Sequence, residues 1–312
     1  MQPVRVMGDV EAVDRATEAD LLGLVAVRPP EQVLRPTPVW DDAEVVAHEV
    51  IDGHYHRLVL RSPAIAHSAT AGQFVMITVP RLGGEHIVLP RPMAIHRRHT
   101  APGTLEGCIE VVFSIVGRGT TELARVEVGH FLRLIGPLGR GFEIPAEATS
   151  VLLMSHGSGA CAVMGVAEDA LARWIPVVAL LSAAMRSAVV GESDCRELGV
   201  EAIVVTEDAA VSGGIANDIP LIDRVLTARF DAAPPSVIMV CGSSQLARAA
   251  VALGRRWNVP VQVSLEAHMA CGLGYCHGCA APVATDGDQE GPLVCHDGPV
   301  FDAHTPASLP PL

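Results

Sequence analysis

The chain has 312 residues, a formal net charge of −13 and a hydrophobic fraction of 49%, with aromatic residues at only 4%. The acidic balance argues against nucleic acid and against an anionic membrane surface, because both partners need a basic face. No apolar run approaches the ~18 residues of a spanning helix, so we expect no insertion into a membrane. The length predicts two or three modest domains, and the irregular cysteine spacing predicts a reducing, cytoplasmic location.

The first part of the chain predicts an antiparallel β-barrel. Residues 1–43 are polar and punctuated by proline, which indicates an N-terminal extension rather than a domain. Between residues 44 and 146, short runs rich in β-branched residues are separated by turn residues. The runs are VVAHEVID, HYHRLVLRS, GQFVMITVP, GCIEVVFSIVG and GHFLRLIGP. Several short strands at this spacing are typical of a small barrel.

Residues 147–258 predict a doubly wound α/β domain. The apolar runs SVLLMS, IPVVALLSAA, VEAIVVTED and PSVIMVCGS each precede a segment with helical spacing, the first being ACAVMGVAEDALARW. Strands that alternate with helices form a parallel sheet. Residues 259–303 then form a small cysteine-rich segment, and residues 304–312 are a tail. The chain is therefore expected to be multidomain.

Three of the eight cysteines crowd the stretch CGLGYCHGC. Its spacing, Cys271-x4-Cys276-x2-Cys279 with Cys295 further on, is the plant-type arrangement for a [2Fe–2S] cluster. The interspersed glycines allow tight turns and let backbone N–H groups approach the sulfurs. A zinc site is the alternative, but zinc ligands usually come in two short pairs and here the fourth cysteine stands alone. The remaining cysteines are expected to be buried small side chains; these are Cys108, Cys161, Cys195 and Cys241.

The order of motifs from residue 44 to residue 303 resembles one family. SLEAHMACGLGYCHGC and LVCHDGPVFDA, with GQFVMITVP, LPRPMAIH, VVFSIVGRGTTEL and GPLGRGFEIP upstream, are similar to the electron-transfer subunit of the two-subunit, NAD-linked dihydroorotate dehydrogenases, within the ferredoxin reductase-like superfamily. The resemblance implies an FAD-binding barrel, a nucleotide domain for NAD(P)H, and a cluster that serves the flavin of a catalytic partner subunit. It implies an oxidoreductase subunit in pyrimidine biosynthesis whose cofactors carry the chemistry, with no catalytic side chain of its own.

Two of these motifs suit the FAD pyrophosphate on physical grounds. A guanidinium at a strand end, as predicted for Arg91, can bind phosphate oxygens bidentately. The GRGT motif precedes a helix-like segment whose first backbone N–H groups suit a phosphate. The family usually has Ser where this chain has Ala94, so one hydroxyl contact is lost. The resemblance assigns the following to the flavin site: Arg91, Pro92, Met93, Ala94, Val112, Phe113, Ser114, Gly119 and Thr120.

The nucleotide-binding loops depart from the family pattern. The glycine loop Gly-Gly-Gly-Ile-Gly is here residues 155–159, SHGSG, and the bulky His156 should obstruct close approach of a ligand to the backbone. The later motifs also differ, as TEDAAVSGGIAND and as CGS at residues 241–243. If NAD(P)H binds, the expected contacts are Gly157, Gly159 and Cys241. Two hypotheses follow: a working NAD(P)H-linked subunit, or a relay or scaffold subunit that does not bind NAD. A zinc-stapled binding module is a third, which the flavin motifs disfavour.

Overall fold

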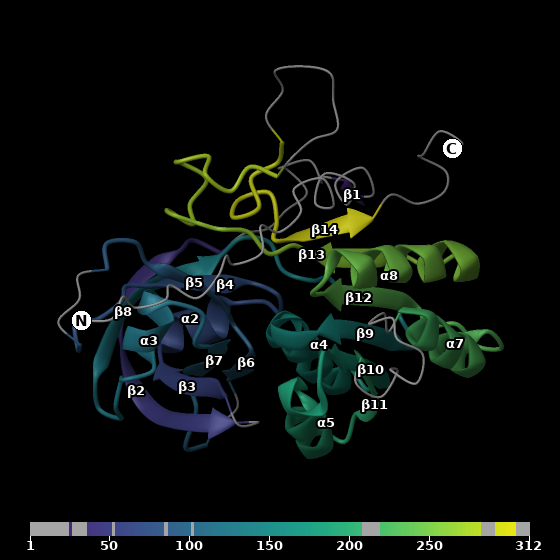
Figure 1. Cartoon of the computed structure of the whole chain (residues 1–312), viewed down its shortest axis with the longest axis horizontal. Coiled ribbons are helices and arrows are strands. Elements are labelled where there is room, and N and C mark those ends of the chain that lie inside the picture. The colour runs from purple at the N-terminus through teal and green to yellow at the C-terminus, as the bar shows by residue number, and fades with distance from the viewer. Residues whose placement is uncertain are drawn as a thin grey trace, which may run out of the picture.

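The computed structural model describes residues 25–26, 36–51, 54–83, 87–100, 103–207, 219–281 and 291–303. These residues form two seven-stranded sheets that lie side by side, with the cysteine-bearing loops above them in Figure 1. None of the helices in these ranges combines the length and the apolar character needed to cross a membrane. The expected combination of an antiparallel domain, an α/β domain and a C-terminal cysteine segment is confirmed.

The antiparallel sheet has the strand order β5-β4-β8-β2-β3-β7-β6. Its strands are β2 (Val39–Ile51), β3 (Tyr55–Arg61), β4 (Phe74–Ile77), β5 (Arg91–Ala94), β6 (Arg97–His99), β7 (Cys108–Ser114) and β8 (Phe131–Leu138). Two short helices, α2 (Pro63–Ser68) and α3 (Arg118–Leu123), join them. The five predicted runs all form strands: β4 and β7 are buried on both faces, whereas the first half of β8 alternates between a buried and an exposed face. In β8, for example, Leu132 and Leu134 are buried, whereas Phe131 is exposed.

Residues 91–99 connect the two edges of this curled sheet. β5 pairs with β4 at one edge, and β6 pairs with β7 at the other. Between them the backbone N–H of Ile95 donates to Gln73 O at 2.9 Å, and that of His96 donates to Glu110 O at 2.8 Å. The chain therefore leaves one edge and joins the other within two residues, and this bend closes the barrel.

The second sheet has the strand order β1-β14-β13-β12-β9-β10-β11. Its strands are β1 (Val25–Ala26), β9 (Val151–His156), β10 (Val177–Ala183), β11 (Glu201–Thr206), β12 (Val237–Cys241), β13 (Val261–Ser264) and β14 (Val300–Ala303). Its helical segments are η2 (Gly157–Gly159), α4 (Ala160–Ala172), η3 (Arg186–Ala188), α5 (Glu192–Leu198), α7 (Ile219–Phe230) and α8 (Ser244–Trp257). Strands β9 to β13 are mutually parallel, whereas β14 and β1 are antiparallel additions.

Helices cover both faces of this sheet, as a doubly wound fold requires. Leu152 and Met154 of β9 pack on the face covered by α7 and α8, and Val151 and Leu153 pack on the face covered by α4 and α5. Ala71 of the barrel packs in the same cluster as the α4 side chains. The helices α4 and α5 therefore separate the nucleotide-type sheet from the barrel.

The sheets extend beyond the predicted segment boundaries. β2 begins at Val39 rather than at residue 44, because Val39 to Ala43 pair with β8. β13 and β14, which the sequence places in the cysteine segment, pair with the sheet and with each other. The cysteine loops are thus an excursion between two adjacent strands, and β14 pairs in turn with β1 from the N-terminal extension. The tail at residues 304–312 and most of residues 1–35 lie outside the described ranges.

Candidate functional site

The four predicted cluster ligands lie together on the loops between β13 and β14. Cys279 and Cys295 are buried, Cys271 is half-buried and Cys276 is exposed. The first loop packs on the barrel: a Cβ at Gly272 would lie 2.9 Å from the Met76 sulfur of β4. The cysteine segment therefore rests on the barrel while both of its ends belong to the other sheet.

Backbone N–H groups point at the cysteine sulfurs, as the glycine content predicts. The N–H of Leu273 donates to Cys271 Sγ at 3.3 Å, and that of Gly274 donates to Cys295 Sγ at 3.2 Å. The N–H of Cys295 donates to Cys279 Sγ at 3.4 Å. Such hydrogen bonds favour the thiolate over the thiol, and metal ligation needs the thiolate.

The sulfurs fall into two pairs. The Cys271 thiol interacts with that of Cys276, and the Cys279 thiol with that of Cys295. Although burial opposes it, the hydrogen bonds from backbone N–H groups lower the pKa of Cys271 to about 6. Burial, followed by the neighbouring Cys279 thiol, raises the pKa of Cys295 to about 12.

This arrangement bears on the choice between iron and zinc. No three of the four sulfurs, all of which are described, lie within 4.8 Å of one another. A tetrahedral zinc site with Zn–S bonds of about 2.3 Å would hold all four sulfurs about 3.8 Å apart. Two pairs of thiols, between which Cys271 and Cys295 also interact electrostatically, match a centre with two metal ions, each held by two ligands. The donor set therefore fits a two-iron cluster better than a single zinc ion.

The two predicted flavin motifs meet in space. A Cβ on Gly119, in the first turn of α3, would lie 2.6 Å from Arg91 Nη2, so the guanidinium rests against the glycine backbone. Arg91 Nη1 donates to Leu89 O at 2.9 Å. The Thr120 hydroxyl accepts from the N–H of Val116 at 2.9 Å, which holds the loop before α3. A guanidinium beside the start of a helix is a site for phosphate oxygens.

The other predicted flavin residues divide between two environments. Ala94 and Val112 pack against Cys161 of α4 at the junction with the α/β domain. Met93 and Phe113 are buried in the barrel core, so that only their backbone is open to a ligand. Pro92, the second residue of β5, and Ser114, the last residue of β7, are half-buried.

The predicted nucleotide residues lie at the carboxyl ends of β9 and β12. A Cβ on Gly159 would lie 2.8 Å from Gly242 N, so the two loops are in close contact. The space beside Gly157 is open. The Cys241 thiol is buried, and burial raises its pKa well above the usual value. His156 Nδ1 lies 3.0 Å from the Ser182 hydroxyl, which places the imidazole across the ends of β9 and β10. Most of the motif TEDAAVSGGIAND, residues 208–218, lies outside the described ranges.

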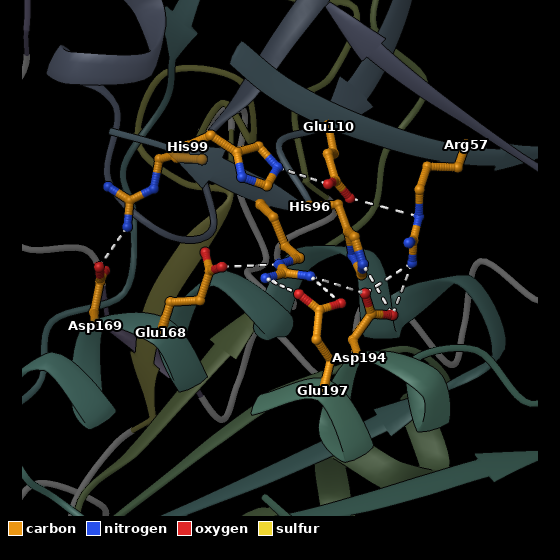
Figure 2. Close-up of polar contacts among 10 residues, drawn as sticks. Arg57, His96, His99, Glu110, Glu168, Asp169, Asp194 and Glu197 are labelled. Carbon is orange, nitrogen blue, oxygen red and sulfur yellow. Dashed lines mark hydrogen bonds and ion pairs between the residues drawn. The ribbon is translucent and has the colours of Figure 1, made fainter. Parts of the chain in front are cut away.

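A further polar network, which the sequence did not predict, lies where the barrel meets α4 and α5 (Figure 2). Arg57 of β3 donates to both oxygens of Asp194 at 2.7 and 3.0 Å. Arg97 of β6 donates to Glu168 of α4 at 2.8 Å and to Glu197 of α5 at 3.1 Å. The signal in the sequence was the basic run HRRH at the end of the flavin motif, but its partners lie far away along the chain.

Solved structures with the same architecture define the class. The structure of an NADH-dependent reduced ferredoxin-NADP oxidoreductase has a TM-score of 0.66 at 23% identity and covers 84% of this chain and 88% of its own. A ferredoxin reductase in carbazole 1,9a-dioxygenase has a TM-score of 0.57 at 20% identity, over 75% of this chain and 71% of its own. The fold is therefore ferredoxin reductase-like, with an added cysteine segment.

The sequence relatives identify the family. The iron–sulfur cluster binding domain of dihydroorotate dehydrogenase B matches residues 266–305. The dihydroorotate dehydrogenase B (NAD(+)) electron transfer subunit of Bacillus caldolyticus is 30% identical over 263 residues, which cover 83% of this chain and 95% of that protein. The subunit of the same name from Desulforamulus reducens is 26% identical over 260 residues, 83% of this chain and 95% of that protein. This chain belongs to the family of dihydroorotate dehydrogenase B electron transfer subunits, which confirms the resemblance seen in its motifs.

Proposed function

We propose that this chain carries FAD on its barrel and a [2Fe–2S] cluster on Cys271, Cys276, Cys279 and Cys295. It would pass electrons between NAD(P)H and the flavin of a partner dehydrogenase that acts on dihydroorotate, in the cytoplasm. The observation that carries this proposal is the pairing of the four thiols, with backbone N–H groups aimed at their sulfurs. When bound, FAD exchanges electron pairs with a nicotinamide and the cluster carries single electrons.

The side chains of this subunit would bind and orient the cofactors. Arg91 and the start of α3 at Gly119 would hold the FAD pyrophosphate, and Ala94 and Val112 would face its ring from the barrel. The N–H groups that donate to sulfur would tune the cluster potential, since hydrogen bonds to cluster sulfurs raise it. These residue assignments rest on the contacts described above.

The exposed end of the cluster loop would face the partner. Tyr275 is 89% exposed and Leu273 is 45% exposed. The cluster ligand Cys276, which follows Tyr275, is also exposed. Apolar side chains gathered around an electron-carrying site are typical of a protein interface. Docking there would bring the partner's flavin next to the cluster.

A relay that does not bind NAD is the second candidate. The observation that favours it is His156, whose ring lies across the ends of β9 and β10, where the family has glycine. Nucleotides bind at the carboxyl ends of such strands. In this version the α/β domain would serve as a docking surface, and electrons would enter through protein contact.

An anaerobic titration with NADH, followed by the visible spectrum of the cofactor-replete protein, separates the two candidates. If NADH at stoichiometric amounts bleaches the flavin and cluster bands, the chain is an NAD-linked subunit. If dithionite bleaches both bands and neither NADH nor NADPH does so, the relay is correct. A colourless protein that stays colourless after reconstitution with FAD, iron and sulfide would refute both.

A further inference from the structure

His96 lies at the bend that closes the barrel, between β5 and β6. Its neighbour Ile95 points into the barrel core, whereas His96 points the other way, toward α4 and α5 (Figure 2). The side chain is completely buried. A buried histidine at a domain junction is either neutral and hydrogen-bonded or charged and paired with acids. Its surroundings decide between these states.

Acidic groups surround the imidazole from two elements. Nε2 of His96 lies 3.4 Å from Asp194 Oδ2 of α5, whose side chain is 1% exposed. One ligand atom each of His96, Asp194 and Glu110 of β7 lie within 4.8 Å of one another. Cys161 of α4 also interacts with the ring. Arg57 of β3 contacts both carboxylates, at 2.7 Å from Asp194 and 3.5 Å from Glu110.

The network as a whole lacks positive charge unless a histidine supplies it. Four carboxylates, of which Glu197 is 63% exposed and therefore hydrated, share two guanidinium groups, while a separate pair at the edge, Arg98 with Asp169, balances itself. Within the part of the chain that the structure describes, the other basic side chains in contact with these carboxylates are His96 and His99. His99 Nε2 donates to Glu110 Oε1 at 2.7 Å and is 20% exposed. The four carboxylates are Glu110, Glu168, Asp194 and Glu197, and the guanidiniums belong to Arg57 and Arg97.

An unpaired carboxylate is most costly where water is excluded. The carboxylate of Asp194 beside His96 is in such a place, because both side chains are buried. Although burial opposes the charged form, the Asp194 carboxylate and then the Cys161 thiol raise the pKa of His96 to about 10. The same contact with His96, followed by Arg57 and Arg97, lowers the pKa of Asp194 to about 2 against the effect of burial.

We propose that His96 is a positioning residue: a buried imidazolium that joins the barrel to α5 through Asp194 and so fixes the α/β domain against the flavin site. The proposal rests on the proposed function in one respect, since Ala94, two residues earlier on the same face, is a proposed flavin contact. The charge of His96 holds the segment that carries both residues. The ion pair would then fix the position of Ala94 relative to α5, and with it the approach of a nicotinamide to a flavin when both are bound.

The alternative role for His96, Glu110 and Asp194 is to bind a metal ion. The histidine and the two carboxylates offer a plausible ligand set. However, Arg57 donates to both oxygens of Asp194 and its Nε lies 3.5 Å from Glu110 Oε2, while His99 donates to the other oxygen of Glu110. A divalent cation at this place would lie against the positive charge of the Arg57 guanidinium, which opposes its binding. A protonated His96 supplies the positive charge that the carboxylates need and leaves the contacts of Arg57 and His99 in place.

Histidine NMR on the intact chain tests the charge directly. The ring ¹³Cε1 and ¹⁵N shifts of His96, assigned with a His96→Gln variant, should stay those of an imidazolium from about pH 6 to pH 9. The exposed His67 of α2 provides the reference signal of a histidine outside the network. This measurement needs neither NADH nor a partner, so it stands even if the proposed function fails. Titration of His96 near 6.5, or one divalent ion per chain that His96→Gln loses, would overturn the proposal.

Kinetics test the positioning role. In His96→Gln, we expect kcat for flavin reduction by NADH to fall on the order of tenfold, with KM and the flavin potential unchanged. His96→Lys, which keeps the charge, should recover part of the loss, and the control His67→Gln should behave as wild type. Wild-type kcat in His96→Gln, or equal losses in the Gln and Lys variants, would contradict the positioning role. If His96→Gln does not fold, the His96→Lys variant assigns the His96 signals, and the NMR result on the wild-type chain decides.

Discussion

The contact between Arg91 and Gly119 predicts a sharp effect of a single methyl group. In Gly119→Ala, the new Cβ would lie 2.6 Å from Arg91 Nη2, far inside van der Waals contact, so the guanidinium must move. Hydrogen bonds to a charged group contribute about 1.5–3 kcal/mol. Loss of the phosphate contact should therefore weaken FAD binding roughly 10- to 150-fold. The barrel should remain folded, because the atoms that must move belong to the end of a flexible side chain and Arg91 lies on the edge strand β5.

The same loop contains a matched control. Gly117, which precedes α3, has an extended backbone with φ of 177°, and its Cβ would meet nothing within 4 Å. Gly117→Ala should therefore keep the FAD affinity of the wild type. The assay is the quenching of FAD fluorescence on titration into deflavinated protein, with urea unfolding to verify that both variants are equally stable. If the two variants bind FAD equally well, Arg91 does not hold the pyrophosphate in the manner proposed.

Three further predictions test the cluster, the domain junction and the nucleotide loop. Gly274 has φ of +76° and its Cβ would lie 3.0 Å from His296. Gly274→Ala should cost about 1–2 kcal/mol of backbone strain and lower the iron bound per chain. The control is Gly278→Ala, whose Cβ would be in ordinary van der Waals contact with Cys276 Sγ at 3.6 Å and which should bind iron normally. Because the pKa of His96 rises from 6.5 to about 10 on folding, its stabilisation is complete below pH 6.5 and is lost as the pH rises toward 10. The free energy of unfolding in urea should thus fall by about 2 kcal/mol between about pH 6.5 and 8, and a His96→Gln variant that showed the same slope would refute the assignment. His156→Gly should lower the NADH concentration needed for half-reduction of the flavin, and an unchanged value would mean that the imidazole is no obstacle.

Local patterns in the sequence account for most of the fold. The five barrel runs and the alternating apolar strands are long enough for their periodicity to be read, and all of them form the expected strands. β13 and β14 have four residues each, too few to show a period, and they were assigned to the cysteine segment. They belong to the sheet because they pair with β12 and with each other. Pairing is a property of the folded chain that short segments do not reveal.

The cluster site was predictable because its spacing is local, whereas the domain junction was not. Cys271, Cys276 and Cys279 carry their chemistry in nine consecutive residues. In the network, by contrast, Arg57 and Asp194 are 137 residues apart, and Arg97 and Glu168 are 71 apart. These arginine and acidic residues follow no periodic pattern, and the sequence around each of them predicts an ordinary charged side chain on the surface. Only the packing of α4 and α5 against the barrel brings them together and removes them from water.

The segment from residue 91 to residue 99 links the proposed flavin site to the contact between the two domains. Its first residue, Arg91, rests on α3, and its later residues His96 and Arg97 contact α4 and α5. Both halves are pinned by strand pairing, to β4 on one side and to β7 on the other. A shift at one end cannot be absorbed by a flexible loop, since the bend between the halves is itself hydrogen-bonded at Ile95 and His96. The default expectation for two domains is relative motion, but here such motion would break buried ion pairs and displace the residues proposed to contact the flavin.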